Sequence, residues 1–325
     1  MRSFFLRVLA VLVAGAALLT VGFNTHGNYD VREPESCKLN YAVISDTHIE
    51  GNNTTRYKVF AKCLQDVTRN RSGHDAVVFL GDNTMNGQHI ENMLFHGSVN
   101  RIMRNETILP VMGNHDIGNG NGDYEKLQNR WYDYTKAMFG RELSHPYYYQ
   151  VIDGCYFIVL GMEAHLVYEM MMTQEQFAWL EGVLNEAKDS GKPVFVFSHY
   201  PSDEVIDEEG NSTDRLVDML AEYNKTNDLF YFCGHTHMPL YLFWSFHSNN
   251  GYPEIYLPRI TELSGENDNE VYKKTGDGVE VEVYSDHVLV RGRDFYRGEW
   301  RVDDEETGEL CEKTYTLKNP IVSAK

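Results

Sequence analysis

Five short apolar runs in this sequence each end in aspartate, histidine or asparagine. Three of the runs lie at 39–45, 75–83 and 107–116, and two later ones lie at 192–201 and 228–237. Apolar residues at consecutive positions over this length are typical of strands that are buried on both faces. Because segments with helical periodicity separate most of the runs, the pattern predicts β-α-β units and therefore an α/β fold.

The segments between these runs carry helix and hairpin signals. In residues 55–70 the apolar positions recur at i, i+1, i+4, i+5 and i+8, which places them on one face of a helix. Further helices are predicted at 91–105, 124–139, 173–191 with Thr173 as its cap, and 212–224 with Ser212 or Thr213 as its cap. Hairpins are predicted at 147–161 and 279–295, with turns at Asp153-Gly154 and Ser285-Asp286.

The charge of the chain argues against nucleic acid as a partner. The formal net charge is −19, and because the first 29 residues carry only Arg2 and Arg7, the remainder carries −21. Such a surface repels DNA, RNA and anionic membranes unless a local basic patch overrides it. We therefore expect no nucleic-acid substrate, and a membrane contact only through the N-terminal segment.

The N-terminal segment has the pattern of an export signal. Val8 to Phe23 is a 16-residue stretch without a charge, behind the two arginines. This length lies between a secretory signal and a full membrane span, and no clear cleavage site follows. Residues 1–29 are predicted to be a signal peptide or an N-terminal membrane anchor, with a plain buried helix as the least favoured alternative. Residues 30–37 are then a linker, and 38–325 form a single domain outside the cytoplasm.

The five cysteines give no clear disulfide framework. Cys155 and Cys233 lie in apolar strand-like runs, which favours buried free thiols. A bridge between Cys37 and Cys311, which would tie the two ends of the domain together, is a weaker alternative.

The polar residues at the ends of the strands form one constellation. Carboxyl ends of parallel strands meet at one edge of a sheet, so residues distant in sequence converge there. Imidazole, carboxylate and amide groups without thiolates favour Zn, Mn or Fe, and ligands from five strand ends indicate two divalent ions. Each residue alone could be an ordinary loop or turn residue. Such an explanation does not account for all of them together, because each follows an apolar run. The candidates are Asp46, His48, Asp82, Asn114, His115, His199, His235 and His237.

The motifs "DTH", "GDN", "GNHD", "FSHYP" and "GHTH", in this order, resemble those of the calcineurin-like metallophosphoesterases. The resemblance covers roughly residues 38–295 and implies a two-sheet β sandwich flanked by helices, with two metals at its edge. It also implies that one metal takes Asp46, His48 and His237, that the other takes Asn114, His199 and His235, and that Asp82 bridges them. His115 is similar to the family's general acid.

Departures from the family pattern narrow the resemblance. The segment "GDNTMNG" has Met85 and Asn86 where the Ser/Thr protein phosphatases carry aspartate and arginine. Met85 also stands where the purple acid phosphatases carry a tyrosine ligand. The chain is therefore more similar to the small phosphodiesterase and general phosphohydrolase branches, and two peripheral segments resemble those of exported bacterial members.

These residues lead to a mechanistic hypothesis. A hydroxide bridging the two metals attacks phosphorus, and His115 protonates the leaving oxygen. Asp116 either orients His115 or caps the following turn. The substrate is a small phosphorylated molecule, such as a nucleotide, a lipid head group or a metabolite, and the choice between monoester and diester stays open. The alternatives are a metal-binding adhesion module without catalysis and a nuclease.

Overall fold

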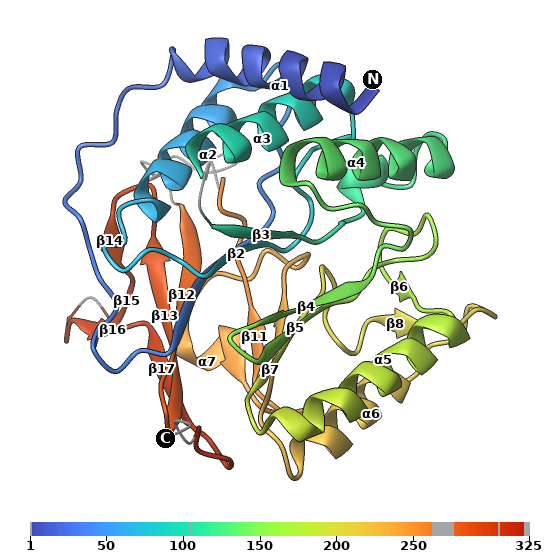
Figure 1. Ribbon diagram of the computed structural model, residues 1–325, viewed down its shortest axis with the longest axis vertical. Coiled ribbons are helices and arrows are strands. Elements are labelled where there is room, and N and C mark those ends of the chain that lie inside the picture. Colours follow the sequence, from blue (N-terminus) through green and yellow to red (C-terminus); the bar gives the residue numbers. More distant parts are fainter. Residues whose placement is uncertain (1, 104–105, 262–275, 305, 322–325) are drawn as a thin grey trace.

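The computed structural model describes residues 2–103, 106–261, 276–304 and 306–321. Two β-sheets pack face to face, and helices cover the outer face of each sheet (Figure 1). This arrangement confirms the α/β class and the two-sheet sandwich that the sequence predicts.

The first sheet has a parallel half and an antiparallel half. β1 pairs in parallel with β2, and β2 with β3, whereas β12 runs antiparallel to β1. The strand order is β14-β13-β12-β1-β2-β3, and β17 pairs with β13 beside β14. The strands are β1 (Leu39–Ile44), β2 (Ala76–Phe79), β3 (Thr107–Pro110), β12 (Asp277–Val283), β13 (His287–Asp294), β14 (Glu299–Trp300) and β17 (Glu312–Thr316).

The second sheet has the order β10-β11-β9-β7-β5-β4, and β5, β7, β9 and β11 run parallel to one another. Its strands are β4 (Tyr148–Ile152), β5 (Cys155–Val159), β7 (Val194–Phe197), β9 (Leu229–Cys233), β10 (Phe246–His247) and β11 (Glu254–Tyr256). Two small pairs lie outside it: β6 (Met170–Met171) with β8 (Val205–Ile206), and β15 (Val302–Asp304) with β16 (Glu309–Leu310).

Aromatic side chains fill the core between the two sheets. Tyr41 of β1 meets Phe157 of β5 and Phe195 of β7 edge to face, with ring centroids 5.0 and 5.1 Å apart. All three side chains are fully buried. Because site residues follow β1 and β7, and β5 pairs with β7, this packing fixes the two halves of the site relative to each other.

The helices lie in two outer layers. α2 and α3 cover the first sheet, α5 and α6 cover the second, and α4 lies beside α3 (Figure 1). The helices are α1 (Arg2–Leu18), α2 (Thr54–Val67), α3 (His89–Ile102), α4 (Tyr124–Phe139), α5 (Gln174–Ala187), α6 (Arg215–Asn224) and α7 (Leu242–Ser245), with short 3-10 turns at His115–Ile117 and Lys188–Ser190.

Most predicted elements are present, with some differences at their ends. The helix predicted at 212–224 begins at Arg215, with Asp214 and not Ser212 or Thr213 at the cap position. Asp214 makes no side-chain capping bond, and Thr213 Oγ1 accepts a hydrogen bond from Arg215 N at 3.2 Å. Thr213 N donates to Val205 O, and Ser212 bridges to Ile206, so both residues pair with β8 instead. Of the helix predicted at 91–105, residues 104–105 lie outside the described residues. Residues 262–275, 305 and 322–325 of the predicted domain lie outside them too.

The N-terminal segment is packed on the rest of the chain. α1 runs across α3 and α4, with Ala10 and Ala14 fully buried (Figure 1). In the segment predicted as a linker, Arg32 N donates to Glu282 Oε2 at 2.8 Å, so this segment lies on the first sheet. Among the residues that the structure describes, no helix has the length and apolar character needed to cross a membrane.

All five cysteines are free thiols. Cys155 and Cys233 are buried, as their apolar surroundings predict. Cys37 and Cys311 are not bridged, which removes the weaker alternative.

Candidate metal centre

The ends of five strands meet at one edge of the sandwich and bring the predicted site residues together. The first sheet contributes Asp46 and His48 after β1, Asp82 after β2, and Asn114 and His115 after β3. The second sheet contributes His199 after β7, and His235 and His237 after β9. Contacts between these side chains connect the two sheets, so the candidate site is shared by both halves of the fold.

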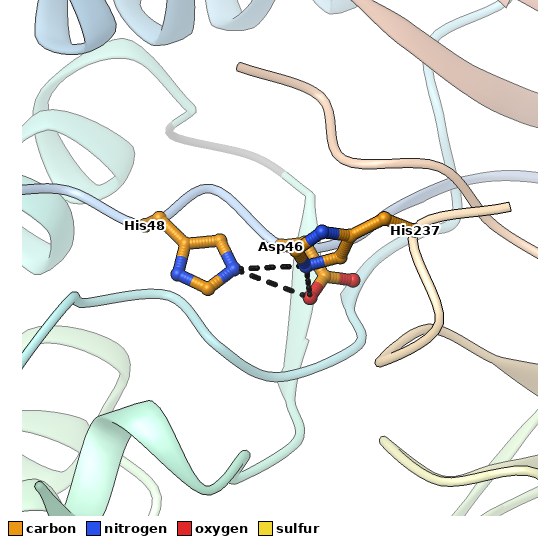
Figure 2. A group of neighbouring side chains, drawn as sticks. All are labelled: Asp46, His48 and His237. Atoms are coloured by element: carbon orange, nitrogen blue, oxygen red, sulfur yellow. Dashed lines mark hydrogen bonds and ion pairs between the residues drawn. The ribbon is translucent and has the colours of Figure 1, made fainter. Parts of the chain in front are cut away.

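Among the described residues, three groups of side chains have the spacing of a metal site. They are Asp46 with His48 and His237, Asp46 with Asp82 and His199, and His48 with Asp82 and His115. Asp46 Oδ1, His48 Nε2 and His237 Nε2 point toward a common centre (Figure 2). The Asp46–His237, His48–His237 and Asp46–His48 pairs are separated by 3.0, 3.1 and 3.4 Å at these atoms. Ligands about 2.1 Å from an ion lie roughly 3.0 to 3.4 Å apart in octahedral or tetrahedral geometry. These three residues therefore fit around one ion.

A second group lies on the other side of Asp82. His199 Nε2 is 3.1 Å from Asn114 Oδ1 and 3.2 Å from Asp82 Oδ1, the same range of separations. The His235 ring lies 5.2 Å from the His199 ring, between centroids. The other oxygen of Asp82, Oδ2, is 3.6 Å from His48 Nε2. The Asp82 carboxylate thus faces both groups, one oxygen to each.

Several of these residues have a backbone conformation that side chains rarely adopt. Asp46, His48, Asp82, His235 and His237 all have positive φ angles, between 42° and 62°. Only two other non-glycine residues of the described chain share this feature. Because left-handed backbone costs free energy for residues with a Cβ, the surrounding fold must hold these five in place. The strain is concentrated where candidate ligands converge.

Glycines in the motifs allow the strand ends to approach closely. A Cβ at Gly113 would lie 2.3 Å from both the backbone N and Oδ1 of Asp82. A Cβ at Gly234 would lie 2.0 Å from Ser45 Oγ and 2.5 Å from Asp46 Oδ2. Such contacts are far inside van der Waals distance, so only glycine fits at these positions.

Backbone carbonyls set the orientation of two histidine rings. His199 Nδ1 is 2.8 Å from Leu80 O, and His115 Nδ1 is 2.8 Å from Met85 O. A carbonyl only accepts, so each Nδ1 carries the proton and the Nε2 atom of each ring faces the site.

Asp116 ties two loops of the site together. Its carboxylate accepts hydrogen bonds from Gly113 N at 3.0 Å, from Thr84 N at 2.8 Å and from Asn83 Nδ2 at 3.2 Å. Burial raises the pKa of Asp116 to about 7, with Asp82 adding to the shift. Since Met85 O occupies the Nδ1 atom of His115, the observed contacts of Asp116 orient the loops and not the His115 ring.

The candidate ligands differ in charge state. Burial opposes ionisation of Asp46 and Asp82, but contacts with histidines outweigh it and hold the pKa of both carboxyls well below their usual range. Burial lowers the pKa of His48 and His235 to about 4, which leaves neutral imidazoles able to bind a metal. For His199, the opposing effect of burial is exceeded by Asp82, which raises the pKa to about 9.

One charged residue near the site lies outside all five motifs. Arg259 follows β11, and its neighbour Ile260 donates from N to Ser45 O at 3.1 Å, beside the end of β1. Burial is the main cause of the low pKa of His48, and the positive charge of Arg259 adds to it. The sequence offered no signal for this residue, because only the folded chain brings it next to His48.

Two sequence comparisons agree with this geometry. The model of the calcineurin-like phosphoesterase family matches residues 39–239, which include every candidate ligand. A relative from Arcobacter nitrofigilis, named "Probable glycerophosphodiester phosphodiesterase GpdQ", is 26% identical over 216 residues. These residues are 62% of this chain and 73% of the relative.

Solved structures show the same fold. A dimetal phosphatase from Danio rerio superposes with a TM-score of 0.54 at 15% identity, over 80% of this chain and 97% of that one. The purple acid phosphatase PPD1 from yellow lupin has a TM-score of 0.54 at 14% identity, over 81% of this chain and 52% of that one. At these identities the likeness concerns the fold alone.

Proposed function

Because this chain belongs to the calcineurin-like phosphoesterase family and is a phosphoric ester hydrolase, we propose that it is a metal-dependent phosphodiesterase acting on small diesters. The observation that carries the proposal is the spacing of the candidate ligand atoms, 3.0 to 3.4 Å within the Asp46, His48 and His237 group.

The proposed centre holds two divalent ions, Mn, Fe or Zn. Imidazoles, carboxylates and one amide oxygen make up the donor set, which suits these metals. Near Asp82 the pKa of His199 is raised against the effect of burial, so this residue would give up its Nε2 proton when an ion binds. Asp82 is the shared ligand, since its two oxygens face the two groups. The first ion is assigned to Asp46, His48 and His237, and the second to Asn114, His199 and His235.

The chemistry of the reaction is divided between the ions and the chain. Two divalent ions held here supply a water of lowered pKa and positive charge beside the phosphoryl group. His115 acts as the imidazolium: Met85 O holds one proton on Nδ1, and the second proton, on the Nε2 atom that faces the site, passes to the leaving oxygen. Asp116 keeps the loops that carry Asp82 and His115 in register.

A small diester is favoured as the substrate for two reasons. The relative from Arcobacter nitrofigilis is named for glycerophosphodiester hydrolysis, and it matches 62% of this chain. The net charge of −19 disfavours a long polyanion such as DNA. A diester with one negative charge, such as a glycerophosphodiester, meets less repulsion than a polynucleotide.

The test compares a diester with a matched monoester. Purified full chain is assayed with bis(4-nitrophenyl) phosphate, 4-nitrophenyl phosphate and a glycerophosphodiester, with added Mn²⁺ and again after chelation. We expect chelator-sensitive turnover with the higher kcat/KM for diesters. A preference for the monoester would make the enzyme a phosphatase, and hydrolysis of plasmid DNA at comparable rates would make it a nuclease. Turnover that survives chelation would contradict the metal centre.

The place of action is a further part of the proposal. The uncharged stretch from Val8 to Phe23 behind two arginines supports export of the catalytic domain from the cytoplasm. Protease added to intact cells that produce the full chain should digest the domain. Protection in intact cells, with digestion after lysis, would contradict export.

A further inference from the structure

Both faces of α1 carry apolar side chains. Ala10 and Ala14 are fully buried on the inward face. Phe5, Leu9 and Leu12, spaced along the opposite face, are 66%, 50% and 64% exposed. A surface helix of a soluble protein normally turns polar residues outward, whereas from Val8 onward this helix carries only apolar side chains and one glycine.

The inward face makes a close, shape-specific contact with α3. A Cβ at Gly97 would lie 2.5 Å from Ala10 O and 2.9 Å from Ala14 Cβ, so glycine is needed for the two helices to approach. Tyr57 OH of α2 donates to Ala14 O at 3.4 Å. Small residues on both partners are typical of closely packed helix pairs. α1 is therefore docked along its inward face, and only its outward face remains available.

Large apolar side chains are exposed along α1 and in the segment that follows it. We call them the α1 patch, which consists of Phe4, Phe5, Val8, Leu9, Leu12, Leu19 and Phe23, all exposed. Leu19 and Phe23 are 88% and 93% exposed. An exposed patch of large apolar side chains marks a surface that is covered by something else.

Three basic residues lie in or beside α1 and the segment that follows it, in an otherwise acidic chain. Arg7 and Lys58 are exposed, and Arg101 lies against Gly15 at the end of α1. A cavity of about 710 Å³ between α1 and the helices below it is lined by Arg69, Arg101 and apolar residues that include Val21. An apolar face with a basic rim matches the chemistry of an anionic lipid surface.

We propose that α1 lies in the headgroup region of a lipid bilayer, with the α1 patch among the lipid chains and the basic rim at anionic headgroups. The proposal goes beyond the hydrolase activity and does not depend on the metal assignment. A second copy of this chain is the competing occupant. Charge favours lipid, because a two-fold dimer would bring two basic rims together, whereas anionic headgroups are complementary to the single rim of each chain.

Sedimentation with vesicles tests the proposal on the full chain. The vesicles are phosphatidylcholine alone, and phosphatidylcholine with phosphatidylglycerol at a ratio of about three to one. We expect salt-sensitive binding that is stronger to the anionic vesicles. The variant Phe5→Gln/Leu9→Gln/Leu12→Gln replaces the exposed apolar side chains by residues that still favour a helix. Its affinity for the vesicles should fall by about tenfold or more.

A matched variant controls for the loss of exposed apolar surface in general. Phe243 and Trp244 in α7 are 78% and 60% exposed and lie outside the α1 patch. Phe243→Gln/Trp244→Gln should leave vesicle binding unchanged. The variant Arg7→Gln/Lys58→Gln should lose the preference for anionic vesicles while it keeps its thermal midpoint.

Three results would overturn the proposal. The first is that the triple variant binds vesicles as strongly as the parent chain. The second is that the α7 variant loses as much vesicle binding as the triple variant. The third is that the parent chain binds no vesicles but forms a dimer in solution, and that the triple variant does not form this dimer. If the triple variant no longer melts cooperatively, Phe4→Gln/Phe5→Gln at the exposed start of α1 replaces it. The same readings then decide the outcome.

Discussion

Gly113 and Asp82 lie so close together that a methyl group on the glycine would be 2.3 Å from the carboxylate Oδ1. The two residues belong to neighbouring loops, after β3 and β2. The same oxygen accepts a hydrogen bond from His115 N at 2.8 Å. The backbone of residues 113–115 therefore fixes the position of the Asp82 carboxylate.

Gly113→Ala should therefore displace Asp82 and damage the site. A displacement of about 1 Å at a catalytic group costs on the order of 100-fold in rate. We expect kcat/KM for a diester to fall by at least that factor, together with metal content. Gly182→Ala is the control, because a Cβ there meets nothing within 4 Å and should add about 0.5–1 kcal/mol to the stability of α5. Unchanged activity in Gly113→Ala would contradict the role of the close contact.

Asp82→Asn tests whether one carboxylate serves both groups. Asparagine tolerates the left-handed backbone at this position, where φ is 48°, so the change isolates the charge. Removal of a shared anionic ligand should lower the number of metal ions bound per chain as well as the rate. Elemental analysis of the purified variant measures this, and two ions retained per chain would refute the sharing.

His115→Ala should lower the rate without emptying the metal centre. General acid catalysis contributes about 10²–10⁴-fold, and the loss should be greater for an alkyl leaving group than for 4-nitrophenolate, which leaves without protonation. His287→Ala, at the start of β13 and away from the site, is the control. A loss that is equal for both leaving groups would assign His115 a role other than proton donation.

The stability of the fold should depend on the protonation of Asp277. Burial raises the pKa of Asp277 to about 7, Arg301 offsets part of this, and Asp294 adds to it. In the unfolded chain the pKa of an aspartate carboxyl is about 3.9. Between about pH 3.9 and about pH 7 the folded state therefore binds one more proton than the unfolded state, and the free energy of unfolding falls as pH rises. The fall is at most about 1.4 kcal/mol per pH unit in this window.

Urea unfolding at pH 5 and pH 8 measures this effect. Asp277→Asn should gain stability relative to the parent chain at pH 8 and change it little at pH 5. A larger gain at pH 5 than at pH 8 would show that Asp277 is not protonated in the fold.

The buried pair of Arg293 and Asp66 should be needed to hold the N-terminal segment on the first sheet. Arg293 Nη2 lies 2.8 Å from Asp66 Oδ2, both side chains are buried, and the Arg293 guanidinium lies 3.6 Å from the centre of the Tyr29 ring. Arg293→Ala removes the arginine partner of the buried Asp66 carboxylate and leaves His26 Nδ1, 3.7 Å from Oδ1, as its neighbour. Breaking such a buried pair costs about 3–5 kcal/mol. Lys225→Ala breaks an exposed pair and should change urea stability by less than about 1 kcal/mol.

The strands and the candidate ligands could be predicted from the sequence because both signals are local. Each ligand follows an apolar run within a few residues, as Asp46 follows Ile44 and His199 follows Phe197. Parallel pairing then brings the strand ends to one edge. The fold class could be predicted for the same reason, because the alternation of strands and helices is also a local signal.

Features that depend on contacts between distant residues could not be predicted. Nothing near Met85 indicates that its carbonyl binds His115, 30 residues away. The left-handed backbone at His235 is imposed by packing and not by its residue type. The docking of α1 depends on Gly97, whose close contact with Ala10 appears only once the helices meet.

The division of the site between two sheets constrains when this protein can acquire metal. With the proposed ligands, Asp46, His48, Asp82 and Asn114 belong to the first sheet, and the three histidines of the second sheet complete the set. A growing chain of which only the parallel strands of the first sheet have left the ribosome lacks part of the ligand set proposed for each ion. Metal capture is then among the last steps of folding, after residue 237 has left the ribosome and the sheets have packed. The amount of bound metal would thus measure the fraction of molecules in which the two sheets have packed together.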